Sequence, residues 1–294
     1  MAVWAQLIMN GLIAGSIYAL MAAGFSLMFA LQRFMNIAHG SSYVVAAFIA
    51  YTFAVILKFP MWISFLIGIL AAAVLGILIN LIIFQPLQKQ KEKNNALLLS
   101  SFGVFLLVEA IILMVYGADV KSFGLPVKVG MDVLGAKVTP VQLVIICMAP
   151  VIFGLLALFL YKTKTGVALR ATADNETIAK TMGINVRFMT YLTTGLGSAL
   201  GGVAGILVAL EQNLEHSMGM MAVLKGLTAA IIGGIGNVPA AILGGYLLGL
   251  AENIGVWYVP SGYKDAIGFG VFILFLLFRP QGFFGEKRRE EASG

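Results

Sequence analysis

A few ionisable side chains inside long apolar stretches dominate the chemistry available to this sequence. Two carboxylates, Glu109 and Glu252, and one lysine, Lys225, occupy such positions. A charge buried among apolar residues is costly unless a partner compensates it. Either carboxylate could pair with Lys225 or with a partner subunit, and both could take part in proton or ion coupling. We therefore expect these side chains to face other protein or a water-filled path.

Uncharged polar residues lie in or at the edge of the same apolar stretches, namely Asn10, Asn36, His39 and Asn253. His39 is equally compatible with a structural histidine and with a residue on a path. Asn36 ends a turn and could simply cap the helix that follows it. Each of these side chains is expected to face protein or water.

The sequence contains none of the motifs that mark common catalytic sites. GxSxG, HExxH, paired cysteines and the Rossmann fingerprint are missing. GxxxxGK[ST] is missing too, so the chain lacks the phosphate-cradling loop of an ATPase. One cysteine and two histidines are too few for a zinc site, and no metal is expected. The chain is predicted not to be an enzyme.

The composition is that of an integral membrane protein. The chain has 294 residues, of which 60% are hydrophobic and 11% charged. This charge is too sparse for a water-solvated surface, and the apolar content is too high for intrinsic disorder. The net charge of +6 comes from basic residues in short loops beside apolar runs, which indicates membrane orientation rather than nucleic-acid binding.

The apolar runs predict an all-α, polytopic helix bundle of about eight to nine transmembrane segments in a single domain, 1–294. The 221–236 run is broken by Gly233, Gly234, Gly236, Asn237 and Pro239, which favours a half-helix or re-entrant segment. The runs lie near 1–31, 37–57, 61–84, 95–116, 139–161, 188–210, 221–236, 238–256 and 265–278.

Basic residues predict the orientation of the bundle. Arg33 and the segments 85–95, 162–187 and 279–294 hold 13 of the 19 lysines and arginines. The positive-inside rule places these segments in the cytoplasm, with the N-terminus outside and the C-terminus inside. Trp4, Trp62 and Trp257 then fall at the outer edge, as an aromatic belt requires.

The external loop, about 117–138, has alternating apolar residues around Gly130 and Gly135. This pattern predicts a small β-hairpin. The loop is either a plain connector or a docking ledge for an extracytoplasmic partner.

Glycine spacing predicts where helices approach closely. Gly197, Gly201 and Gly205 share one helix face, Gly11 and Gly15 share another, and Gly245 with Gly249 share a third. Such faces serve either static packing or sliding between states.

The cytoplasmic segment 162–187 is predicted to form two short helices. Thr165 can cap the first, which runs through Ala173, and Asp174 or Asn175 can cap the second, with Gly183 as its stop. A plain connector does not require two capped helices, whereas a docking site for another protein does.

Five stretches carry a recognisable pattern. The chain resembles the permease subunits of bacterial ABC importers for branched-chain amino acids, specifically the smaller of the two paired membrane subunits. Urea and short-amide permeases look similar, so the resemblance indicates the family more strongly than the substrate. The stretches are NGLIAGSIYALMAAGFSLMF at 10–29, NIAHGSSY at 36–43, TGVALRATADNETIAKTMGIN at 165–185, LKGLTAAIIGGIGNVPAAILGGYLLGLAEN at 224–253 and FRPQGFFG at 278–285.

The resemblance implies a bacterial cytoplasmic (inner) membrane location and a set of partners. These are a second permease subunit, two cytoplasmic ABC ATPases that bind ATP and Mg²⁺, and an extracytoplasmic substrate-binding protein. No cofactor is expected in the chain itself. The residues that match the family's ATPase-coupling loop are Gly166, Arg170, Ala171, Asn175, Ala179, Gly183 and Ile184. Gly233, Gly234, Gly236, Asn237 and Pro239 match its glycine-rich turn, although Ala240 stands where many relatives have glycine.

The expected mechanism is alternating access driven by the partner ATPases, along a moderately apolar path. Two other classes stay open. Carboxylates such as Glu109 and Glu252 would suit an ion-coupled secondary transporter. A membrane scaffold or intramembrane enzyme is disfavoured, because the chain has no catalytic cluster. The candidate path residues are Asn10, Ser16, Tyr18, Asn36, His39, Glu109 and Glu252, and the pattern assigns no role to Glu109.

Overall fold

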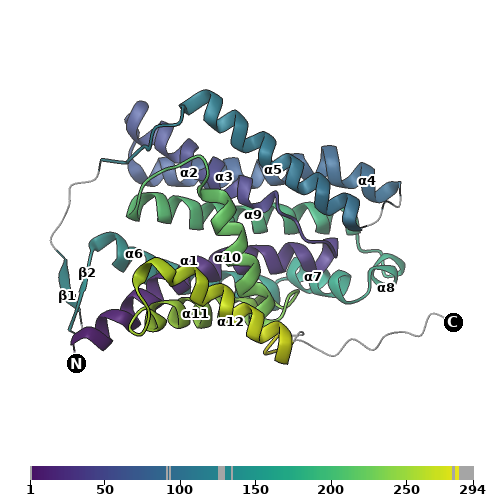
Figure 1. The fold of residues 1–294 in the computed structure, drawn as a ribbon. Coiled ribbons are helices and arrows are strands. Elements are labelled where there is room, and N and C mark those ends of the chain that lie inside the picture. The colour runs from purple at the N-terminus through teal and green to yellow at the C-terminus, as the bar shows by residue number, and fades with distance from the viewer. Residues whose placement is uncertain are drawn as a thin grey trace.

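The computed structural model describes residues 2–90, 92, 94–124, 130–133, 135–279 and 282–284. Its long helices run between two ends of the molecule (Figure 1). Within the described residues, eight helices are long and apolar enough to cross a membrane. The α-helices in these eight spans are, in order, α1 (Ala2–Gln32), α2 (His39–Tyr51), α3 (Met61–Ile79), α5 (Asn94–Tyr116), α6 (Pro140–Lys162), α9 (Val186–Glu211), α11 (Val238–Gly255) and α12 (Lys264–Phe278). The predicted all-α membrane bundle is confirmed.

The predicted half-helix is α10 (Met218–Gly233), with 16 residues. At 1.5 Å per residue it spans about 24 Å, less than the roughly 30 Å of a bilayer core. It ends at Gly234, whose φ of 129° is a backbone conformation that suits glycine. α10 and α11 then form a helical hairpin around the glycine-rich turn.

Two apolar runs contain wider π-helical turns. The first, η1 (Thr52–Ile56), continues α2, and the second, η2 (Asn80–Phe84), continues α3 into the short α4 (Gln85–Lys89). A third irregular piece, the 3-10 turn η3 (Ser261–Tyr263), leads into α12. Hydrophobic periodicity gave no sign of these local changes in helical pitch.

Helices α1 and α9 form the centre of the bundle. In each, 78% of the membrane-length window is buried inside the protein, against 22% for α5 and α6. Gly201 on α9 faces the His39 ring, and Gly197 faces the carbonyl oxygen of Gly24 on α1. The predicted glycine face of α9 therefore contacts both α1 and α2.

The other two predicted glycine faces meet each other. A Cβ at Gly249 on α11 would lie 2.5 Å from the Cα of Gly15 on α1, and one at Gly245 would lie 2.5 Å from the Cα of Ala19. Backbone atoms of the two helices are thus almost in contact. Only glycine allows this spacing at these positions.

A small hairpin lies at the end of the molecule where α1 begins (Figure 1). Strand β1 (Met131–Val133) pairs antiparallel with β2 (Ala136–Val138), which confirms the predicted hairpin. The Gln6 side chain fixes it to α1 by accepting from Lys137 N at 2.8 Å and donating to Lys137 O at 3.1 Å. Residues 125–129 and 134 of the external loop lie outside the described residues.

The short helices α4, α7 (Lys164–Asp174) and α8 (Glu176–Thr181) gather at the opposite end (Figure 1). Trp4 and Trp257 pack together with ring centroids 5.7 Å apart, at the hairpin end of α1. Trp4 and Trp257 thus lie at the end of the molecule opposite α4, α7 and α8 (Figure 1). Of the tail 279–294, the structure describes Arg279 and 282–284 only.

Candidate functional site

A cavity of about 500 Å³ lies toward the hairpin end of the molecule. It is lined by the first half of α1, Tyr43 of α2, the start of α6, the end of α9, the starts of α10 and α12 and the end of α11. Its apolar wall is formed by Ile13, Ala14, Ile17, Met21, Val208, Met218, Met221 and Ala222. Its polar wall is formed by Asn10, Tyr18, Tyr43, Gln142, Glu211, Gln212, Lys225, Asn253, Lys264 and Asp265.

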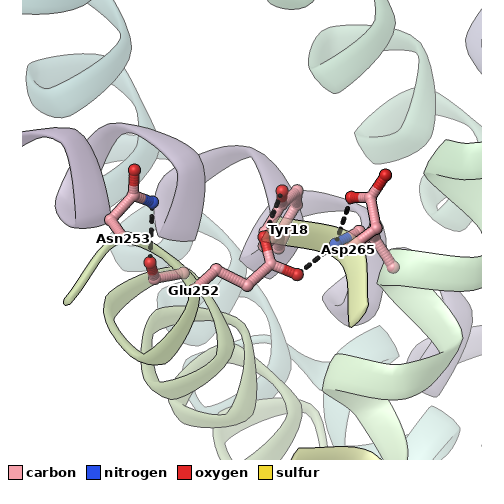
Figure 2. Close-up of polar contacts among 6 residues, drawn as sticks. Tyr18, Glu252, Asn253 and Asp265 are labelled. Atoms are coloured by element: carbon pink, nitrogen blue, oxygen red, sulfur yellow. Dashed lines mark hydrogen bonds and ion pairs between the residues drawn. The ribbon is translucent and has the colours of Figure 1, made fainter. Parts of the chain in front are cut away.

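The ammonium group of Lys225 is the centre of the polar wall. It forms an ion pair with Glu252 Oε1 on α11 and a second with Asp265 Oδ1 on α12, the latter at 2.9 Å. The hydroxyl of Tyr18 on α1 donates to Glu252 Oε2 at 2.9 Å. Figure 2 shows Tyr18, Glu252 and Asp265 in this network, which with Lys225 joins α1, α10, α11 and α12. A lysine and a carboxylate at this depth are tolerated because each compensates the other.

A glycine makes room for this ion pair. Gly268 is the one buried residue of α12, all of which the structure describes. A Cβ at Gly268 would lie 3.2 Å from Lys225 Nζ and would collide with Glu252 Oε1. Any larger residue there would push α12 away from the pair. The sequence thus places glycine where a third helix must approach two buried charges.

The polar wall carries a further carboxylate, Glu211, at the end of α9. Gln142 donates to Glu211 Oε1 at 3.0 Å. Gln142 is itself held by a capping box, in which its Oε1 accepts from Thr139 N and its own N–H donates to Thr139 Oγ1. The start of α6 therefore orients a charge on α9. The cavity as a whole offers both signs of charge beside aliphatic surface.

A second cavity, of about 480 Å³, lies toward the other end of α1. It is bounded by the end of α1, the end of α6, α7 and the glycine-rich turn. Arg33, directly after α1, donates from Nη2 to the carbonyl oxygen of Ala173 on α7. Arg170 on α7 donates from Nε to Leu160 O at 3.1 Å and lies over the Tyr161 ring at 4.6 Å. These two arginines fix α7 against the bundle.

Helices α7 and α8 begin and end at identifiable caps. Thr163, and not the expected Thr165, caps α7, because its hydroxyl accepts from Gly166 N at 3.0 Å. Asn175 caps α8 by accepting from Ile178 N at 3.0 Å, as one of the two predicted residues. Gly183, with φ of 80°, ends α8, and Ile184 N donates back to Ala179 O. The predicted helix pair is confirmed with the first cap shifted by two residues.

The surface of α7 and α8 exposes apolar side chains, although these helices lie at an end of the molecule and not along the predicted spans. Val167, Ile178 and Met182 are exposed on it, with Met182 at 78%. Ala171 and Asn175 are also exposed, whereas Gly166 and Ala179 are buried against the bundle. The segment therefore combines an inner face packed against the bundle with an outer face on which several apolar side chains are exposed.

Comparison with known proteins identifies the family. Residues 7–276 match the family model described as "Branched-chain amino acid transport system / permease component". The chain belongs to this family. It is 30% identical to the high-affinity branched-chain amino acid transport system permease protein BraD of Pseudomonas aeruginosa, over 97% of both chains. It is also 30% identical to the permease protein LivH of the corresponding high-affinity system of Escherichia coli, again over 97% of both chains.

A more distant match covers part of the permease. The autoinducer 2 import system permease protein LsrC of Yersinia enterocolitica is 28% identical over 55% of this chain. Among solved structures, PsaBC from Streptococcus pneumoniae in complex with Fab has a TM-score of 0.52 at 17% identity. The alignment covers 94% of this chain and 92% of that one, and it supports the fold alone.

The permease brings three of the seven candidate path residues to the first cavity. Asn10 and Tyr18 line it, and Glu252 lies directly behind Tyr18 and Lys225. The predicted option that Glu252 pairs with Lys225 is confirmed. Ser16 is buried beside the cavity-lining face, where it donates to Leu12 O at 2.8 Å and contacts the Tyr246 hydroxyl.

The other three candidates lie elsewhere in the permease. Glu109 is half-buried on the peripheral helix α5 and is not among the residues that line either cavity. His39 is buried against Gly24 and Gly201, with no side-chain hydrogen bond to the described residues. Asn36 is buried in the turn before α2, and its side chain does not cap that helix. The capping interpretation of Asn36 is therefore wrong.

Several cavity residues were not anticipated as site residues. Asp265 and Lys264 start an apolar run, Glu211 ends one, and Gln142 and Tyr43 lie within runs. The sequence does place Asp265, Lys264 and Glu211 at the ends of predicted spans on the same side of the membrane. Many other loop residues have the same position, so it could not identify these three as site residues.

The glycine-rich turn joins α10 to α11. Gly234 and Gly236 adopt positive φ, and Asn237 caps α11 by accepting from Ala240 N at 3.2 Å, with Pro239 in its first turn. Gly236 N donates to Ser26 Oγ on α1 at 3.0 Å. The turn is thus anchored to the helix that lines both cavities.

Proposed function

We propose that this permease is the membrane subunit of an ATP-driven ABC importer that moves branched-chain amino acids through the first cavity. The observation that carries the proposal is the composition of the cavity wall. It places a lysine and carboxylates beside an aliphatic surface formed by residues such as Ile13, Ile17 and Met221. A branched-chain amino acid has both charges and an aliphatic side chain. The relatives' names support the same substrate class.

The proposed setting is the bacterial cytoplasmic membrane, with the N-terminus outside and the C-terminus inside. The basic loops at the α7–α8 end support this orientation. The paired Trp4 and Trp257 at the other end support it as an interfacial belt. The first cavity would then lie toward the outside, where a substrate-binding protein delivers its cargo near the β1–β2 hairpin.

ATP and Mg²⁺ would be bound by two separate ATPase subunits that dock at α7–α8. The exposed Ile178 and Met182 supply apolar contacts for such a partner. Arg33 and Arg170 connect α7 to α1 and α6, so a displacement of α7 would be transmitted to the helix that lines both cavities. A second permease subunit would complete the pathway. Closure of the ATPases would open the outer cavity, and hydrolysis would reset it.

Two alternatives remain to be distinguished. A urea or short-amide permease would need no opposite charges in its cavity. An ion-coupled secondary transporter would need a carboxylate that is free to bind and release an ion. Both oxygens of Glu252 are engaged, one by Lys225 and one by Tyr18, which disfavours it as that carboxylate.

The test is purification of the tagged permease from gently solubilised native membranes, followed by identification of the proteins that come with it. We expect an ABC ATPase and a second permease to be recovered. Ile178→Asp with Met182→Asp should remove the ATPase and keep the second permease, because both side chains are exposed. Tyr258→Asp, at an exposed site of the opposite end, is the matched control and should keep both.

Recovery of the permease alone, together with uptake that collapses with a protonophore at constant ATP, would overturn the proposal in favour of ion coupling. An ATPase that stays bound to the double Asp variant would overturn the α7–α8 docking surface while leaving the importer intact.

A further inference from the structure

The two carboxylate partners of Lys225 differ in how deeply they are buried. The Glu252 side chain is 0% exposed, whereas that of Asp265 is 54% exposed. From this asymmetry we propose that Lys225 and Asp265 form an exchangeable ion pair that recognises a zwitterionic amino acid. Lys225 binds the α-carboxylate in place of Asp265, and Asp265 binds the α-ammonium. The inference rests on the proposed function, since it names the substrate class of the same cavity.

Glu252 is the permanent partner of Lys225. Its Oε1 accepts from Lys225 and its Oε2 accepts from Tyr18, so neither oxygen is available to a ligand. A buried carboxylate that lost its lysine would be left uncompensated, at a large free-energy cost. The Lys225 charge therefore stays balanced by Glu252 while its second partner is replaced.

Asp265 is the partner that can be replaced. Its side chain is 54% exposed, so water can hydrate the carboxylate when Lys225 is withdrawn, whereas Lys225, at 6% exposed, stays paired with Glu252. It also lies in the first turn of α12, where the helix dipole stabilises a negative charge without help from Lys225. Since α12 buries only Gly268 within this chain, the start of the helix is weakly held. Releasing Asp265 from Lys225 is thus inexpensive.

Charge balance makes the exchange selective for a zwitterion. A ligand with one carboxylate and one ammonium replaces one internal ion pair by two pairs with the protein. A carboxylate alone would displace Asp265 and leave it unpaired. Urea or an amide has no charge to compensate and gains nothing by opening the pair. Two further charged groups line the cavity, Glu211 at the end of α9 and Lys264 next to Asp265 in the chain, and neither forms an ion pair with Lys225.

The test measures ligand binding to the purified complex without its binding protein, by protection of a cysteine in the cavity. The exposed Cys147 is first replaced by alanine, and Ala222, which lines the cavity, by cysteine. The readout is the ligand concentration that halves the rate of maleimide labelling. The ligands are leucine, isocaproate (leucine without its ammonium), isovaleramide and urea. Thermal unfolding of each variant checks its fold.

We expect leucine to protect, and Asp265→Asn to raise its half-protecting concentration about tenfold or more, since a charge-assisted contact is lost. The half-protecting concentration of isocaproate should instead fall in Asp265→Asn, because its carboxylate no longer competes with that of Asp265 for Lys225. The paired substitution of Lys225→Gln with Glu252→Gln removes the cation without stranding a buried charge, and it should weaken both ligands. Lys58→Asn and Glu215→Gln, at exposed sites, are controls and should change neither.

Leucine protection that is unchanged in Asp265→Asn and in the paired variant would overturn the proposal. Parallel weakening of leucine and isocaproate in Asp265→Asn would also overturn it, since that result indicates a structural role. ATP-driven leucine uptake without leucine protection would overturn this site while leaving the proposed function standing. Protection by urea or isovaleramide equal to that by leucine would contradict the proposed substrate class as well.

Discussion

The guanidinium of Arg33 donates a hydrogen bond to the carbonyl oxygen of Ala173, joining the end of α1 to the end of α7. Arg33 holds this position with a φ of 60°, which is uncommon for a residue other than glycine. α1 also carries Asn10, Ile17 and Tyr18 on the wall of the first cavity. One continuous helix therefore connects the proposed ATPase-docking segment to the proposed substrate site.

Arg33→Asn should uncouple ATP hydrolysis from transport. Asparagine tolerates positive φ, so the backbone is kept while the contact with Ala173 is lost. A hydrogen bond from a charged group contributes about 1.5–3 kcal/mol, so leucine uptake should fall about tenfold. ATPase activity of the complex should stay within about twofold, as the docking surface is unaltered. Lys89→Asn, exposed at the same end, serves as the control, and a parallel fall in both rates would contradict the coupling role.

Gly249→Ala should destabilise the bundle. The new Cβ would lie 2.5 Å from the Cα of Gly15 and 2.7 Å from the carbonyl oxygen of Gly11. Backbone atoms cannot rotate away, so α1 and α11 must separate, at a cost of about 1–3 kcal/mol. Thermal unfolding in detergent should show a lower midpoint. Gly154→Ala, with no atom within 4 Å of its Cβ, should show no such loss. Equal midpoints for the two variants would refute the close helix contact.

Gly201→Ala and His39→Ala should be energetically coupled. A Cβ at Gly201 would lie 2.7 Å from His39 Cε1, and a Cβ at Gly24 would lie 3.0 Å from the same atom, so the ring has little room to move. The glycine substitution should be destabilising alone and less so when His39 is alanine, with a coupling energy of about 1 kcal/mol. Unfolding of both single variants and the double variant measures this. Additive effects would show that the ring is not confined by Gly201.

Gly183 should tolerate asparagine better than alanine. Its φ of 80° costs an alanine about 1–2 kcal/mol, and no atom lies within 4 Å of its Cβ, so backbone strain is the only penalty. Gly183→Ala should loosen the end of α8 and lower the amount of ATPase that copurifies with the permease. Gly183→Asn should retain most of it. Equal loss in both variants would mean that the added side chain, and not the backbone, disturbs the docking surface.

The elements could be predicted closely from sequence because each depends on local patterns. The apolar runs near 95–116 and 139–161 became α5 and α6, and Asn175 and Gly183 were recognisable as the cap and the stop of α8. The cap of α7 was placed at Thr165 instead of Thr163. Two threonines that are two residues apart satisfy the same capping rule.

The cavity could be predicted only in part, because it depends on which helix ends meet. The depth of Glu252 and Lys225 in apolar runs suggested their pairing. Nothing local to Asp265 indicated that α12 would place it 2.9 Å from Lys225. His39 had the same sequence signal as a path residue, yet it packs against glycines of α1 and α9. A polar residue within an apolar run can be recognised from the sequence, but the residue that pairs with it is determined by how the helices pack.

The most direct test is uptake of labelled leucine by the complex in proteoliposomes, with the binding protein outside and ATP inside. The predicted result is uptake that requires ATP, persists with a protonophore and is unaffected by excess urea. Uptake that proceeds without ATP and collapses with the protonophore, or transport of urea in place of leucine, would contradict the proposed importer.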